Sequence, residues 1–310
     1  MAKLKAFVLA GGAMLAVSGL VIPNLAVAAD LLPPPPALEP APRMASPDFG
    51  GWYLRGDVGT AVSNNTPSIA ISPDPLIGAP AGAFNSFYNP TISASSLFDV
   101  GVGYQINNWL RMDVTGEYRG GSHFQVLEQV GVPSTSSQFA DFYRGNLSSM
   151  VGLVNGYVDA GTWYGITPYV GAGVGVARNT LSGVTDTGFA YPGGGAPGSP
   201  TGGYLDNGSK TNFAWALMAG LDFNVTQNLK LDIGYRYLNL GKFTSGASHC
   251  FNGTGQGGGF SVANCGGSGY TLASTNNLSS SDFRLGLRWM LGDSTPAPSY
   301  AAPAPLVRKY

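Results

Sequence analysis

The stretch FRLGLRWML, from Phe283 to Leu291, decides the fold. Its leucines and its tryptophan fall on every second residue, and arginine, glycine or methionine stands between them. A period of two residues predicts a β-strand with two unlike faces. One face is apolar, whereas the other carries Arg284 and Arg288, so the strand needs surroundings that accept both.

The composition indicates that these surroundings are a membrane. Only 11% of the 310 residues are charged, against about 25% in ordinary soluble domains. Beyond the N-terminal segment no stretch approaches the ~18 consecutive apolar residues of a spanning helix, which leaves a closed β-barrel as the other structure that crosses a bilayer. A soluble barrel, the alternative, would place more charge on its outer surface. The net charge of −1 gives no indication of a nucleic-acid partner.

The two ends of the chain differ from the part between them. Two early lysines precede a largely apolar run and the small residues of AVAAD, which predicts a secretory signal peptide over residues 1–28; a membrane anchor is the alternative. Proline-rich segments cover residues 29–50 and 292–310, and so many prolines favour extended spacers. The predicted folded domain is therefore residues 51–291 of an exported protein.

Within this domain we count eight segments with a two-residue period. The links between them alternate between short turns and long links, the latter at about residues 64–96, 120–140, 180–210 and 242–278. This alternation is typical of outer-membrane barrels, which have short periplasmic turns and long external loops. The sequence therefore predicts an all-β fold, an eight-stranded antiparallel up-and-down transmembrane β-barrel with four long extracellular loops and both termini in the periplasm. In the segment 147–158 the apolar residues do not single out one face.

The inward face of the predicted barrel carries equal numbers of basic and acidic residues. An eight-stranded barrel is narrow enough for side chains to fill, and charges buried there need partners, because an unpaired buried charge is costly. We therefore predict a paired charge network that plugs the lumen; a conducting lumen, and with it a small-solute porin, is the alternative. The predicted network consists of Arg55, Asp57, Asp99, Arg111, Asp113, Glu117, Arg119, Asp222, Lys230, Asp232, Arg236, Asp282, Arg284 and Arg288.

The long links are rich in small polar residues and hold scattered aromatic residues but few charges. Such surfaces suit adaptable binding, although exposed loops are commonly polar without any ligand. Cys250 and Cys265 lie in one of these links, and in an exported protein a disulfide is favoured over two free thiols. We expect this disulfide to tie the loop.

No catalytic or cofactor motif stands out in the sequence. The only histidines are His123 and His249, and nothing marks a nucleophile or base beside either. GAGVGVA at Gly171–Ala177 lacks the third glycine of a dinucleotide-binding loop, and close packing inside the barrel explains its glycines better. The sequence predicts no enzyme, no cofactor and no metal site. An envelope enzyme acting on lipid is the alternative, and it would depend on the histidines.

The chain resembles the small outer-membrane β-barrel proteins of Gram-negative bacteria, the opacity-like surface antigens that are often labelled porin family. The resemblance rests on the DLLPPPP after the signal peptide, on LKLDIGYRYLNLG at Leu229–Gly241 and on the last strand. It implies an eight-stranded outer-membrane barrel with a surface or envelope-stabilising role and only sometimes a pore. It also implies a sorting signal for the barrel-assembly machinery, which this chain would form with Arg284, Gly286, Trp289 and Leu291.

The end of the chain departs from this family, whose barrels usually stop at the terminal residue. Here a proline-rich tail runs on to Tyr310, so either the sorting signal is read internally or the last residues do part of that work. The tail could also touch the cell wall through Arg308 and Lys309, or have no function. The partners that we expect are outer-membrane lipid, the barrel-assembly machinery and a host or environmental ligand at the loops. Lipopolysaccharide is a further expected partner. Arg178 would contact its phosphates if Arg178 lies on the lipid-facing strand and not in a loop.

Overall fold

The computed structural model describes residues 51–74, 76, 81–191, 199–252 and 269–291. The predicted signal peptide, proline-rich spacer and proline-rich tail lie outside these residues and stay predictions. No helix within the described part of the chain is long and apolar enough to cross a membrane.

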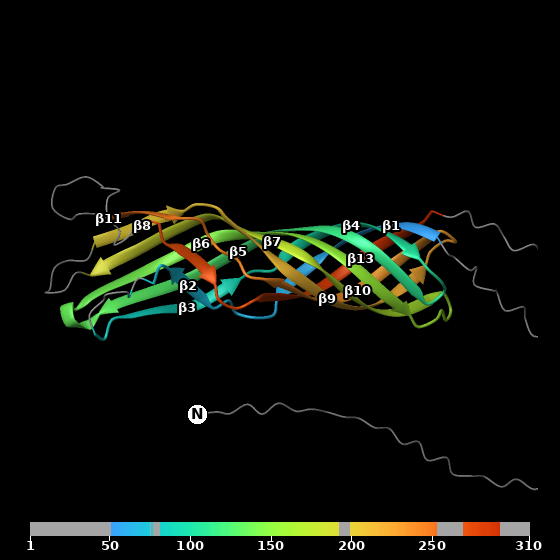
Figure 1. The fold of residues 1–310 in the computed structure, drawn as a ribbon, viewed down its shortest axis with the longest axis horizontal. Coiled ribbons are helices and arrows are strands. Elements are labelled where there is room, and N and C mark those ends of the chain that lie inside the picture. Colours follow the sequence, from blue (N-terminus) through green and yellow to red (C-terminus); the bar gives the residue numbers. More distant parts are fainter. Residues whose placement is uncertain (1–50, 75, 77–80, 192–198, 253–268, 292–310) are drawn as a thin grey trace, which may run out of the picture. The chain divides into compact units, whose positions relative to one another are not determined.

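Eight strands form a closed antiparallel ring (Figure 1). Their order around the ring is β7 (Ile166–Tyr191), β6 (Ser137–Asp159), β5 (Leu110–Val132), β4 (Ser95–Gln105), β1 (Gly51–Ser63), β13 (Leu278–Met290), β10 (Leu229–Gly241) and β9 (Gly208–Asn224). Pairing between β9 and β7 closes the ring, so every strand in it has a hydrogen-bonded neighbour on both sides. The predicted eight-stranded barrel is confirmed.

The last strand, β13, shows the two unlike faces that its sequence predicts. Leu285, Leu287 and Trp289 are about half exposed on the outer surface of the ring. Arg284 and Arg288 are buried inside it. Since successive side chains of a strand point to opposite faces, an apolar surface outside and a charged one inside follow from the same nine residues.

Strand β6 contains the segment whose faces the sequence left open. Met150, Val154 and Val158 are exposed on the outer surface, whereas Val151 and Leu153 are buried in the interior. Both faces are apolar in this part of the strand because Val151 and Leu153 belong to an apolar cluster of the interior. Periodicity alone therefore had nothing to separate the two faces.

Most of the described residues in the predicted long loops are β-structure, so the strands extend further than the sequence predicted. Strands β5 and β6 continue as one hairpin through the 3₁₀ turn η1 (Pro133–Thr135), and β7 pairs with β6 up to Tyr191. Five further strands pair with each other or with this continuation, and Figure 1 shows them gathered at one end of the barrel. They are β3 (Phe84–Ile92) and β8 (Ser199–Leu205), with β11 (Ser248–Asn252) on β8, and the separate pair β2 (Ile69–Ser72) with β12 (Thr271–Ser274).

We call this continuation the extension: residues 122–132 of β5, 137–146 of β6 and 182–191 of β7, together with β3, β8 and β11. Its outer surface differs from that of the ring. The outward residues of β5 change from apolar ones such as Val114 to polar ones such as Gln125. The change in polarity explains why the sequence resembled a loop there, because the lipid-facing pattern ends while the strand continues.

Irregular pairing marks the boundary between the ring and the extension. The register of β5 against β6 shifts between Arg119 and Ser122, and that of β6 against β7 shifts between Arg144 and Asn146. Gly183 beside the second shift has a φ of 58°, a conformation that glycine adopts at little cost. Such bulges bend the wall where the outer surface changes character.

Candidate functional site: the barrel interior

Two arginines and two carboxylates form the centre of the charge network. Arg236 on β10 pairs with Asp282 on β13, with 2.9 Å between Nε and Oδ2, and also with Glu117 on β5. Arg119 on β5 pairs with the same two carboxylates. The four side chains, which we call the central cluster, are at most 4% exposed. Each charge therefore depends on its protein partners for compensation.

A second group of ion pairs lies on the neighbouring strands β1, β4, β5 and β13. Arg55 donates to Asp57 from Nε at 2.9 Å and to Asp113 from Nη1 at 3.0 Å. Arg284 continues the series, because its Nη2 lies 2.5 Å from an oxygen of Asp57 and 2.8 Å from one of Asp99. These pairs tie strands together across the lumen.

A third group surrounds Arg111. Its Nε lies 3.1 Å from Asp159 Oδ1, and its Nη2 lies 3.3 Å from Asp222 Oδ2. Arg288 pairs with the same Asp222. The guanidinium of Arg111 also lies 4.3 Å from the centre of the Tyr157 ring, which is within cation–π range.

The structure buries every member of the predicted network except Lys230. Lys230 is half-buried and has no ion pair with any residue that the structure describes. Asp232 is buried, yet it accepts a hydrogen bond from the hydroxyl of Tyr169 at 3.0 Å and has no arginine partner among the described residues. Asp159 belongs to the network although the sequence did not assign it, because the faces of its strand were ambiguous.

The glycines of GAGVGVA lie on β7, where they make room for large interior side chains. A Cβ atom on Gly171 would lie 2.5 Å from Cδ1 of Tyr157, and one on Gly173 would overlap Asn155. On the next strand, Gly220 leaves the same kind of space for the Tyr169 ring. These contacts support the packing interpretation of the motif.

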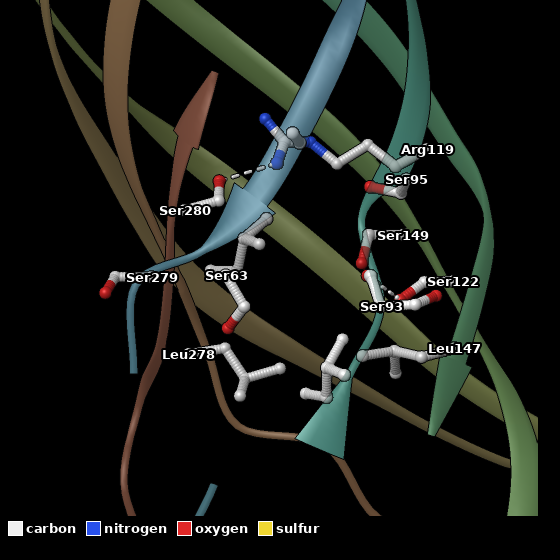
Figure 2. Close-up of a pocket in the computed structure, with 13 residues that line it drawn as sticks. Ser63, Ser93, Ser95, Arg119, Ser122, Leu147, Ser149, Leu278, Ser279 and Ser280 are labelled. Atoms are coloured by element: carbon white, nitrogen blue, oxygen red, sulfur yellow. Dashed lines mark hydrogen bonds between the residues drawn. The ribbon is translucent and has the colours of Figure 1, made fainter. Parts of the chain in front are cut away.

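A small cavity follows the charge network inside the barrel (Figure 2). It has a volume of about 40 Å³ and is lined by Arg119 and several serines, among them Ser149 and Ser280. Arg119 Nη1 donates to the Ser280 hydroxyl at 2.7 Å. A polar cavity of this size has room for a few water molecules and not for a larger solute.

An apolar cluster also lies in the interior, where the sequence did not predict one. Phe124 and Phe243 meet edge to face with 5.4 Å between their ring centres. Leu181, Leu238 and Leu272 are completely buried in the same cluster. The lumen is therefore polar only in part, and packed hydrocarbon side chains fill a further part of it.

Three carboxylates gather inside the extension, and we call them the extension acids. Glu128 on β5 lies directly opposite Asp141 on the neighbouring strand β6. Asp186 on β7 lies opposite Tyr143 of β6. Glu128 is 3% exposed, Asp186 is 8% exposed, and Asp141 is half-buried. Like charges directly opposite each other on neighbouring strands are unfavourable. This arrangement is thus unlike that of the charge network, where opposite charges meet.

Neutral groups supply the hydrogen bonds of the extension acids. Glu128 accepts from the Asn85 amide at 2.7 Å and from the Tyr143 hydroxyl at 2.9 Å. Burial raises the pKa of Glu128 to about 7, against the opposing effect of these two donors. Burial and the nearby carboxylates of Asp141 and Glu128 raise the pKa of Asp186 to about 7. The extension outside the membrane-facing ring therefore holds two carboxyl groups that titrate near neutral pH.

The remaining predicted site residues are placed as follows. His123 Nδ1 lies 3.0 Å from Asn146 Oδ1, and His249 Nε2 lies 2.9 Å from Asp206 Oδ2, both on exposed surfaces. The described residues contain no group of three or more His, Cys, Asp or Glu that is arranged to hold a metal ion. Cys265 and the side chain of Cys250 are not described, so the disulfide stays a prediction.

The four predicted sorting residues do not share one environment. Arg284 takes part in the charge network, and Gly286 lies against Asp57. Trp289 and Leu291 are more than half exposed on the outer surface. Recognition of these four residues by the barrel-assembly machinery stays a prediction.

A comparison with models of known protein families identifies the family of this chain. The model of the outer membrane protein beta-barrel domain matches residues 37–290, which is most of the chain. The chain belongs to this family. Membership places the barrel in the outer membrane. The half-exposed apolar side chains around the ring are therefore the lipid-facing surface of an outer-membrane protein.

Several relatives of this outer-membrane protein are known. An uncharacterized protein of Brucella abortus is 29% identical over 237 residues, which cover 70% of this chain and 76% of that protein. A candidate adhesin of Rickettsia conorii is 28% identical over 68% of this chain and 76% of its own length. The solved structure of the outer membrane protein OprG of Pseudomonas aeruginosa is 11% identical and matches 78% of this chain and 97% of its own, with a TM-score of 0.39.

Proposed function

We propose that this outer-membrane protein is a sealed, non-enzymatic surface barrel that supports envelope integrity and offers its extension for contact with other surfaces. The observation that carries the proposal is the filled interior. Ion pairs occupy one part of the lumen, and the apolar cluster of Phe124 and Phe243 occupies another. An ion crossing such a barrel would have to displace buried salt bridges and enter packed hydrocarbon, and both steps are costly.

We place the extension outside the cell and the chain termini in the periplasm. The short connections β4–β5 and β9–β10 lie at the end of the ring away from the extension. Outer-membrane barrels have their short turns in the periplasm and their longer segments outside. The polar outer surface of the extension suits water on that side.

The outward aromatic residues of the extension support a role in surface contact. Tyr88, Phe142 and Tyr204 are between 43% and 55% exposed and come from three different strands. Aromatic side chains bury much area at little cost in conformational entropy, which makes them frequent anchors of binding surfaces. The candidate adhesin of Rickettsia conorii among the relatives agrees with this role.

The folded barrel is expected to be silent in planar lipid bilayers. Protein refolded without residues 1–28 would first be shown to be folded by its different gel mobility with and without boiling. Ion current would then be recorded at several voltages, with a known porin as the positive control. Reproducible channel steps from folded protein would contradict the sealed interior and favour the small-solute porin.

Loss of the outward aromatic residues is expected to weaken contact with other cells. Bacteria that express the wild-type chain should be retained on cultured epithelial cells, and the double variant Phe142→Ser with Tyr204→Ser should be retained about fivefold less, because aromatic anchors carry much of an interface's energy. Thr187→Ser, an exposed position on the same extension, is the matched control. Equal retention of bacteria with and without the chain would overturn the contact role.

A further inference from the structure

The extension acids have no positively charged partner among the residues that the structure describes. The basic residues on the strands of the extension are His123, Arg144 and His249, and all three are exposed. The sequences of the neighbouring segments 192–198 and 253–268 contain no charged residue at all. Compensation for Glu128, Asp141 and Asp186 must therefore come from protons or from a bound cation, because buried charges without partners are costly.

Asp186 provides an independent indication of a ligand. Its carboxylate is 8% exposed, and its Oδ1 atom has no hydrogen-bond partner within the part of the chain that the structure describes. The position of Asp186 on β7, opposite the buried Tyr143, directs it into the interior of the extension beside the other two acids. A buried acceptor of this kind normally has a donor.

The groups around this acceptor define the chemistry of the ligand. The hydroxyls of Tyr143 and Tyr270 lie 3.1 Å apart, and Thr201 donates to Asp141 at 3.1 Å. The described residues of the site thus present carboxylate and phenol oxygens and no cationic donor. An ammonium group, which has three donors and no acceptor, complements such a set. A bare metal ion fits less well, because the described acids are not arranged as a metal-binding group.

We propose that the extension acids bind the ammonium group of a small polyamine. Asp141 and Tyr270 are half-buried and so reachable from solvent, whereas Glu128 and Asp186 lie deeper. In this proposal the terminal ammonium group donates to Asp186 Oδ1, the buried acceptor that has no hydrogen-bond partner among the described residues. This binding is independent of whether the barrel conducts and of which surface the extension contacts.

Binding of the ammonium group requires ionised carboxylates. The titratable groups that face the site from the packed strands are Glu128, Asp141, Asp186, Tyr143 and Tyr270, and the tyrosines stay neutral because burial raises the pKa of each. The pKa of Glu128 and that of Asp186 are both raised to about 7. Above pH 7 the site is negative, whereas well below pH 7 these two acids are protonated. We therefore expect affinity to fall by at least about tenfold from pH 8 to pH 5.

The test is isothermal titration of spermidine into the folded barrel in a zwitterionic detergent at low ionic strength. Asp186→Asn and Glu128→Gln are each expected to weaken binding by at least about tenfold, since hydrogen bonds to charged groups are strong. If Asp186→Asn or Glu128→Gln does not fold, Asp141→Asn tests the same site, because Asp141 is only half-buried. Asp206→Asn removes an exposed carboxylate of the same region and should leave the affinity unchanged.

Two further ligands separate the alternatives. Tetramethylammonium has the charge without an N–H donor and should bind at least about tenfold more weakly than spermidine. Binding of calcium chloride in preference to spermidine would replace the proposal with a metal site. The proposal would be overturned if wild-type protein did not bind spermidine at pH 8. It would also be overturned if Asp206→Asn weakened binding as much as Asp186→Asn does. The acids would then be compensated by protons alone.

Discussion

Replacement of Arg236 by methionine is expected to lower the free energy of unfolding of the barrel by about 3–5 kcal/mol. Arg236 is 1% exposed and pairs with Glu117 and Asp282, which are buried as deeply. After the substitution, Arg119 is left as the one arginine of the central cluster to compensate both carboxylates. The measurement is urea unfolding of the barrel in phospholipid vesicles, followed by tryptophan fluorescence.

Two companion variants show whether charge pairing is the cause. Lys230→Met removes a positive charge from the same interior, but Lys230 has no ion pair among the described residues, so the loss should stay within about 1 kcal/mol. Adding Glu117→Gln to Arg236→Met restores the balance of the central cluster and should recover at least about 1 kcal/mol. Equal losses for Arg236→Met and Lys230→Met would show that the network contributes nothing specific to stability.

Replacement of Gly286 by alanine is expected to lower the free energy of unfolding by at least about 2 kcal/mol. The added methyl group would overlap the carboxylate of Asp57, which Arg55 and Arg284 hold in place from two sides. Either the backbone of β13 shifts or the carboxylate leaves its two partners, and both changes are costly. The same unfolding experiment measures the loss.

Gly116→Ala is the matched control for this substitution. Gly116 also lies within a strand of the ring, yet an added methyl group there has no atom within 4 Å. The change should therefore stay within about 0.5 kcal/mol. Because refolding in vesicles needs no assembly machinery, the experiment also separates packing from sorting. Normal stability of Gly286→Ala combined with poor assembly in cells would assign Gly286 to the sorting signal and not to the packing of Asp57.

The last strand shows which side-chain orientations can be predicted from a two-residue period. The alternation of leucine with arginine in β13 predicted the outward and inward faces, and a closed barrel followed because a strand with one lipid face and one charged face needs a polar interior. The alternation assigned no face where this contrast is absent. On β6 the interior side chains Val151 and Leu153 are as apolar as the outward ones, so Asp159 could not be assigned to a face.

The extension was missed for a related reason. Gln125 faces water, while Phe124 beside it faces the apolar cluster, and this pattern was interpreted as the start of a loop. Pairing between strands that are distant in the chain, such as β3 with β5, decides that these residues are β-structure. Backbone hydrogen bonds to another strand leave little trace in the composition of either one.

The sequence by itself determined the closed barrel, its number of strands and most of the charges that face its interior, because a two-residue period assigns each side chain to lipid or lumen. Only the tertiary structure decided which charges meet. It pairs Arg236 with Glu117 and Asp282 and leaves Lys230 without an ion pair among the described residues. It also gathers Glu128, Asp141 and Asp186 at a place where the described residues offer no basic partner. Partners across a barrel depend on the register and closure of all its strands, and no single strand carries that information.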